Sequence, residues 1–70
     1  MMNLRKMTEA DIDALTDADV FAAKALAAEA AGKHLFLDPV SYALSQVNYH
    51  GNNTLDAAKA YLKRRRMRFI

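Results

Sequence analysis

The chain has 70 residues, no cysteine and a formal net charge of +2. This length allows one domain at most, and of the 53% of residues that are hydrophobic, 14 residues are alanine. A core with so little bulk supplies only about 3–5 kcal/mol, which excludes a large enzyme with a cofactor pocket. The lack of cysteine excludes a disulfide-stapled secreted scaffold and cysteine-based zinc sites. The chain opens with no apolar leader segment, and its longest uncharged stretch, 39–55, is too polar to span a membrane, so we expect a cytoplasmic protein.

Two capping patterns eight residues apart predict two helices near the N-terminus. Thr8 is followed by Asp11, and Thr16 is followed by Asp19. A threonine with an acidic residue three positions later is typical of a helix start, because each residue can bond the other's backbone N–H. The sequence therefore predicts an N-terminal arm over 1–8, a short helix near 9–15 and a longer helix over 17–31.

The second predicted helix carries an apolar stripe at helical spacing. We expect this stripe to face the core; it comprises Ala18, Phe21, Ala22, Ala25 and Leu26. Gly32 follows and is expected to take the left-handed conformation that commonly ends a helix.

Two further helices are predicted in the second half of the chain. Asp38 and Pro39 suit the N-cap and first position of a helix, which we place over 39–50. Its apolar stripe consists of Val40, Ala43, Leu44 and Val47. After a break at 51–53, Thr54 caps a fourth helix over 55–66, followed by a tail over 67–70. On this helix, Leu55, Ala58, Tyr61 and Leu62 are expected on one side, with Arg65 at its edge.

No segment of useful length alternates between apolar and polar residues as a strand does. The predicted fold class is therefore all-α. We expect a single-domain bundle of three main helices plus a short N-terminal helix, with a radius of gyration of about 11 Å.

Charge is distributed unevenly. Residues 1–35 carry four basic and six acidic side chains, whereas 36–70 carry six basic and two acidic ones. The basic residues of the second half lie close together, at Lys59, Lys63, Arg64, Arg65, Arg66 and Arg68. Like charges on one helix repel, so we expect a source of negative charge to face them. Three sources remain open: a nucleic-acid backbone, an acidic protein surface, or the chain's own acidic N-terminal segment, within one molecule or across a homo-oligomer.

The aromatic residues divide into two groups. Phe21, Phe36 and Tyr61 are expected in the core. Tyr42 and Tyr49 lie off the apolar stripe of the third helix, and exposed tyrosines near arginines are typical of protein–protein hot spots. They are our candidate partner-binding residues, and lining the rim of the core is the alternative role.

No catalytic, metal or cofactor site is predicted. Counted as calcium-binding loops, the acidic pairs that begin at Asp11 and Asp17 lack the required glycine and glutamate. His34 and His50 stand alone without the partners that a metal site or a general base needs. The two glycines are isolated, so they form no phosphate-binding loop.

These observations favour a small helical interaction module that docks on a larger protein as a regulator, inhibitor or assembly subunit. From its small size we further expect an accessory protein of a phage or mobile element. The alternative function is a nucleic-acid-binding module that uses the basic fourth helix and its arginine-rich tail.

Overall fold

The structure is a computed structural model, which describes residues 3–33, 37–51 and 53–68. The described residues contain no strand, which confirms the all-α prediction. The elements, in chain order, are the 3-10 turn η1 (Leu4–Lys6) and the helices α1 (Glu9–Asp13), α2 (Asp17–Lys33), α3 (Pro39–Ser45) and α4 (Leu55–Met67).

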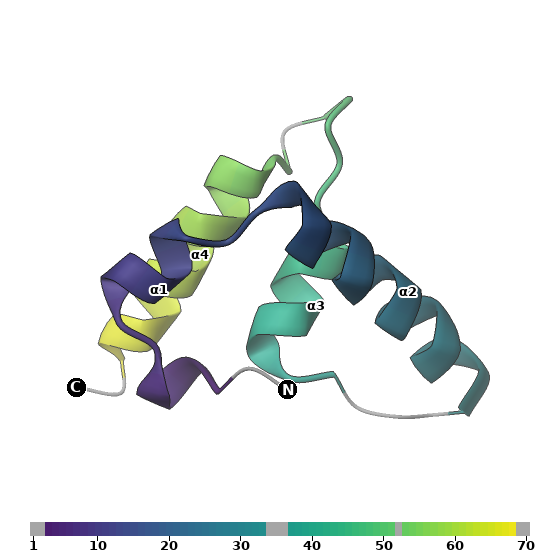
Figure 1. Ribbon diagram of the computed structural model, residues 1–70, viewed down its shortest axis with the longest axis horizontal. Helices are drawn as coiled ribbons and strands as arrows, with labels where there is room; N and C mark the ends of the chain where they lie inside the picture. Colours follow the sequence, from purple (N-terminus) through teal and green to yellow (C-terminus); the bar gives the residue numbers. More distant parts are fainter. Residues whose placement is uncertain (1–2, 34–36, 52, 69–70) are drawn as a thin grey trace.

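Helix α3 lies between α2 and α4 and packs against both. Figure 1 shows α1 alongside α4, and α2 beside α3 on the side away from α4. The radius of gyration is 11.7 Å, close to the expected value, and the molecule measures 34 × 26 × 17 Å. It is therefore a flat bundle, in which α4 contacts both the N-terminal segment and α3.

The helix starts follow the predicted caps. The Thr8 hydroxyl oxygen accepts a hydrogen bond from the Asp11 N–H at 3.2 Å, and the Asp11 carboxylate accepts one from the Thr8 N–H at 2.8 Å. At the start of α2, the Thr16 N–H donates to the carboxylate of Asp19 at 2.7 Å. The Thr54 hydroxyl oxygen caps α4 by accepting from the N–H of residue 57 at 3.3 Å.

The cap of α3 allows a direct test. One Asp38 carboxylate oxygen accepts from the Ser41 N–H and the other from the Ser41 hydroxyl, each at 2.9 Å. We expect Asp38→Ala to lower the free energy of unfolding by about 1–2 kcal/mol, measured by urea denaturation, because the cap is lost. Asp38→Asn is the matched control and should cost clearly less, since asparagine also caps helices. Equal losses in the two variants would contradict this role.

Helix α3 ends at Ser45, so the predicted extent of 39–50 is wrong at its C-terminal end. The cause is Asn48, whose side chain accepts from the His50 N–H at 3.0 Å. The Asn48 backbone N–H donates to the Asn53 carbonyl oxygen, which closes the loop. Asparagine side chains compete in this way with helical hydrogen bonds, so Tyr49 lies in a turn and not on the helix.

The end of α2 also differs from the prediction. The helix continues through Gly32 to Lys33, and Gly32 does not adopt a left-handed conformation. A salt bridge of 2.9 Å between Glu29 and Lys33, one turn apart, spans this position. Such pairs stabilise a helix, and lysine suits its C-terminal turn.

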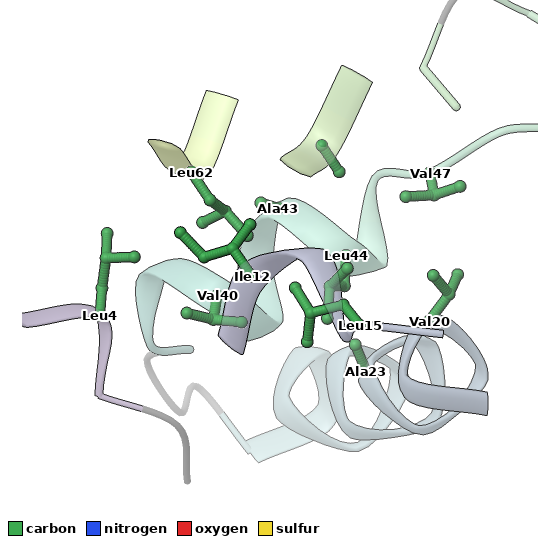
Figure 2. Packing of buried hydrophobic residues seen from close by; sticks show 11 residues of the cluster. Leu4, Ile12, Leu15, Val20, Ala23, Val40, Ala43, Leu44, Val47 and Leu62 are labelled. Atoms are coloured by element: carbon green, nitrogen blue, oxygen red, sulfur yellow. The ribbon is translucent and has the colours of Figure 1, made fainter. Parts of the chain in front are cut away.

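The core gathers one or more residues from every element (Figure 2). All four residues of the predicted stripe are buried; three of them lie on α3, whereas Val47 is buried from the segment that follows the helix. Leu4 from the arm and Leu62 from α4 are also buried, at 2% and 0% exposed. The N-terminal arm is thus part of the fold.

The predicted core face of α2 is wrong. Its buried residues are Val20, Ala23 and Ala30, whereas Phe21 is 78% exposed. Because eight of its 17 residues are alanine, small apolar side chains occur all around the helix. The pattern therefore cannot distinguish the two faces, and the packing of Val20 into the shared core decides between them.

Candidate functional site

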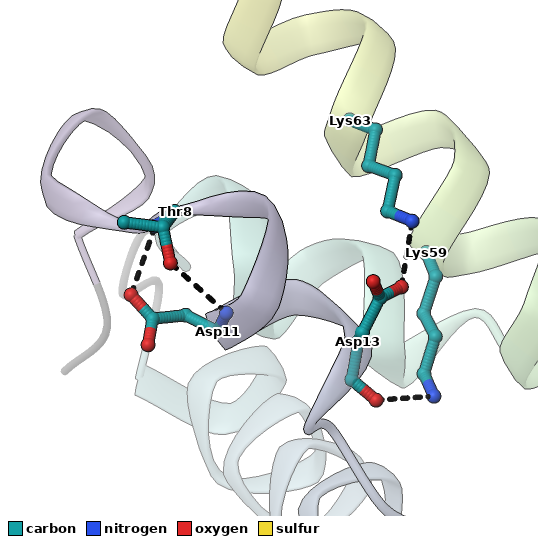
Figure 3. Close-up of polar contacts among 5 residues, drawn as sticks. All are labelled: Thr8, Asp11, Asp13, Lys59 and Lys63. Atoms are coloured by element: carbon teal, nitrogen blue, oxygen red, sulfur yellow. Dashed lines mark hydrogen bonds and ion pairs between the residues drawn. The ribbon is translucent and has the colours of Figure 1, made fainter.

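The six basic residues on and just after α4, from Lys59 to Arg68, form the basic cluster of the protein. Half of them contact the N-terminal segment. The Lys63 ammonium forms an ion pair of 2.6 Å with the Asp13 carboxylate, and Lys59 donates to the Asp13 carbonyl oxygen at 3.0 Å (Figure 3). One turn further along, the Arg66 guanidinium donates to the carbonyl oxygen of Met7. Three of the six cations therefore contact the chain's own N-terminal segment, and one of them, Lys63, pairs there with an acidic side chain, which was one of the three sources left open.

The Asp13 contact changes the titration of Lys63. The hydrogen bond to Asp13 raises the pKa of Lys63 above its ordinary value of 10.5; partial desolvation opposes this, and the charges of Asp13 and Glu9 add to it. A raised pKa in the folded state means that the contact stabilises the fold below the ordinary pKa and is lost as the pH rises above it. At neutral pH the contact is fully formed.

The other three cations point to solvent. Arg64, Arg65 and Arg68 are all exposed. The Arg65 guanidinium donates to the Tyr61 hydroxyl oxygen at 3.1 Å. The side chains of Arg64 and Arg68 form no hydrogen bond or ion pair with the residues that the structure describes. Their charge is therefore available to a partner.

Arg64 borders a groove between α3 and α4 with a volume of about 320 Å³. The base of the groove is apolar, since buried Ala43, Val47 and Ala58 line it. Tyr42 from α3 and Tyr61 from α4 also line it, and their exposed fractions are 54% and 37%. A concave apolar surface bordered by a few polar groups is the usual form of a binding site.

The polar side chains that line the groove include Gln46, Asn53 and Thr54, which can both donate and accept hydrogen bonds, and the positively charged Arg64. The Arg64 guanidinium has donors only. Because the Tyr61 oxygen accepts from Arg65, the Tyr61 O–H proton remains free to donate outward. Among the residues that the structure describes, none with an acidic side chain lines the groove. The charge that Arg64 brings to the groove therefore favours a negatively charged group.

The two tyrosines proposed from the sequence lie in different environments. Tyr42 lines the groove. Tyr49 does not line it, and its hydroxyl donates a hydrogen bond of 2.7 Å to the Asp17 carboxylate at the start of α2. Although Tyr49 is 53% exposed, this bond ties the turn after α3 to α2.

The Tyr49 contact predicts a shifted titration. The hydrogen bond to Asp17, with smaller contributions from desolvation and the Asp17 charge, raises the pKa of Tyr49 above its ordinary value of 10.0. Subtracting the phenolate absorbance titration of Tyr49→Phe from that of the wild type should give a midpoint above 10.0. Since the folded-state pKa is raised, this contact stabilises the fold below that pH and is lost as the pH rises through the shifted pKa. A difference curve with its midpoint at or below 10.0 would contradict the contact.

Tyr61 was expected in the core but is partly exposed on the groove. The sequence contains a signal for this position of Tyr61. Tyr61 and Arg64 are three residues apart, and side chains at this spacing share a helix face, so a tyrosine next to an arginine on the surface could have been predicted. Of the other candidates, His50 is exposed, whereas His34 and Phe36 lie outside the described residues. In the described part of the chain, no three histidine or acidic side chains gather as a metal site would require.

Comparisons of the chain with protein-family models, with curated proteins and with solved structures found no match. Among the described residues, no helix has the length and apolar character needed to cross a membrane.

Proposed function

We propose that this protein is a small helical docking module that binds a larger protein through the α3–α4 groove. The observation that carries the proposal is the groove itself, where Tyr42, Tyr61 and Arg64 surround an apolar base. Tyrosine and arginine are among the residues that contribute most to protein–protein binding, above all around a pocket that excludes water.

The internal contacts of α4 favour this function over nucleic-acid binding. Lys59, Lys63 and Arg66 already contact the N-terminal segment. Affinity for nucleic acid comes largely from the number of phosphates that a protein neutralises. With three of the six cations engaged, α4 retains about half of the phosphate contacts that its sequence suggests, and one of the remaining three belongs to the groove.

A photo-crosslinking experiment tests the docking proposal. Benzoylphenylalanine replaces Gln46, which lines the groove, and the chain is irradiated in its native cells. The matched control carries the same group in place of Phe21, which is exposed on α2 and does not line the groove. We expect a discrete protein adduct from the groove position that resists nuclease treatment and is absent from the control.

Three results would overturn the proposal. They are an adduct that nuclease removes, adducts that form equally at both positions, and no adduct from the groove position when the labelled chain is folded and expressed.

A further inference from the structure

The chemistry of the groove indicates what kind of segment it binds. We infer that the α3–α4 groove binds an acidic peptide segment, in which one large apolar side chain enters the groove and a neighbouring carboxylate pairs with Arg64. This inference rests on the proposed function and adds to it the chemical class of the partner.

The first argument is that most of the chain's own carboxylates are engaged elsewhere and that none of them is placed at the groove. The protein has eight acidic residues. Six of them accept hydrogen bonds or form ion pairs within the fold, namely Asp11, Asp13, Asp17, Asp19, Glu29 and Asp38. The charge of Glu9 acts on Lys63, and Asp56 lies in the first turn of α4, where the helix dipole favours an acid. None of the eight lines the groove in the part of the chain that the structure describes, so we expect the carboxylate that meets Arg64 there to come from another molecule.

The second argument is the direction of the hydrogen bonds at the groove. Arg64 and the Tyr61 hydroxyl offer donors beside the apolar base, and Arg65 holds the Tyr61 oxygen in place. A carboxylate accepts from several donors at once, and an arginine–carboxylate pair is among the stronger hydrogen-bonded contacts. A basic or neutral segment would leave Arg64 without a partner.

The third argument is the combination of apolar and charged surface. The buried side chains at the base offer no hydrogen-bonding group, so they favour an aliphatic or aromatic side chain. Arg64 lines the same groove. An apolar side chain and a carboxylate must therefore lie close together in the ligand, as they do in neighbouring residues of a peptide.

Selection from a phage-displayed library of random short peptides tests the inference. We expect the immobilised wild-type chain to enrich peptides that combine aspartate or glutamate with one aromatic or large aliphatic residue. Arg64→Glu should lose this acidic preference. Arg68→Glu is the matched control, because it makes the same change in charge on an exposed residue of the same helix end that does not line the groove, and it should keep the preference.

A synthetic peptide with the enriched sequence then gives the magnitude. Replacing its acidic residues with their amides should weaken binding to the wild type by about tenfold or more, measured by isothermal titration calorimetry, as expected for the loss of a charge-assisted hydrogen bond. The same replacement should have little effect on binding to the Arg64→Glu variant.

The outcomes separate this inference from the proposed function. Enriched peptides that need Tyr42 and Tyr61 but show no acidic preference would overturn the inference and leave docking at the groove intact. Failure to enrich any peptide that depends on these tyrosines would overturn both. Acidic enrichment that Arg64→Glu and Arg68→Glu abolish equally would overturn the specific pairing with Arg64. Self-association of the wild type that Arg64→Glu abolishes would make a second copy the occupant and would also overturn the inference.

Discussion

Leu62→Ala is expected to leave most of the protein unfolded at 25 °C. Leu62 is 0% exposed and joins α4 to the core. Removing a buried leucine side chain costs about 2–5 kcal/mol, which approaches or exceeds the total of about 3–5 kcal/mol expected for so small a core. The loss should be visible as reduced helical circular dichroism and the disappearance of a cooperative urea transition.

Met67→Ala is the matched control for this prediction. Met67 lies on the same helix but is 65% exposed, so its removal should change the free energy of unfolding by less than about 0.5 kcal/mol. A Leu62→Ala variant that unfolds cooperatively with a loss similar to that of the control would contradict the core described above.

The double variant Tyr42→Ala, Tyr61→Ala is expected to abolish docking while leaving the fold intact. Each tyrosine lines the groove and is partly exposed, so truncation removes contact surface from the partner more than from the core. Hot-spot residues cost about 2 kcal/mol or more when truncated, which corresponds to a fall in affinity of about thirtyfold. The yield of the adduct from benzoylphenylalanine at position 46 should fall accordingly.

Phe21→Ala is the control for the double variant, since it removes an exposed aromatic side chain that does not line the groove. It should leave the adduct yield unchanged. Docking through the groove would be contradicted if Phe21→Ala reduced the yield as strongly as the double variant, or if the double variant kept the full yield while remaining folded.

The helix starts could be predicted from the sequence because capping is local. A cap needs only a side chain and a backbone group about three residues apart, as with Thr8 and Asp11 or Asp38 and Ser41. The end of α3 was harder to predict. It depends on the loop that Asn48 and Asn53 close, and the hydrophobic pattern alone does not show that loop.

The buried face of α2 could not be predicted, because alanine gives little contrast between the sides of a helix. On α3, by contrast, the large aliphatic side chains of Val40 and Leu44 lie on the same face of the helix, and that face is buried. Periodicity therefore indicates a core face where large and polar residues alternate, and fails where small apolar residues surround the helix.

The basic residues of α4 were recognised as a group, but their division into two sets depends on tertiary contacts. Lys63 meets Asp13, fifty positions earlier in the sequence, whereas Arg64 is exposed and lines the groove. Helical spacing separates these faces, but only the packing of α1 on one side of α4 and α3 on the other shows what each face meets.

The central claim is that internal contacts engage three of the six basic residues, Lys59, Lys63 and Arg66, and we propose on this basis that α4 does not follow a nucleic-acid backbone. Binding of the purified chain to mixed DNA and RNA, measured by fluorescence anisotropy over a salt series, tests this claim most directly. We predict weak binding at low salt with a log–log slope that corresponds to no more than about three released ions, as Arg64, Arg65 and Arg68 alone would give. Tight binding with a slope that corresponds to about four or more ions, and that falls when Lys59, Lys63 and Arg66 are replaced by glutamine, would contradict the claim, because the cations that now face the N-terminal segment would then bind phosphates.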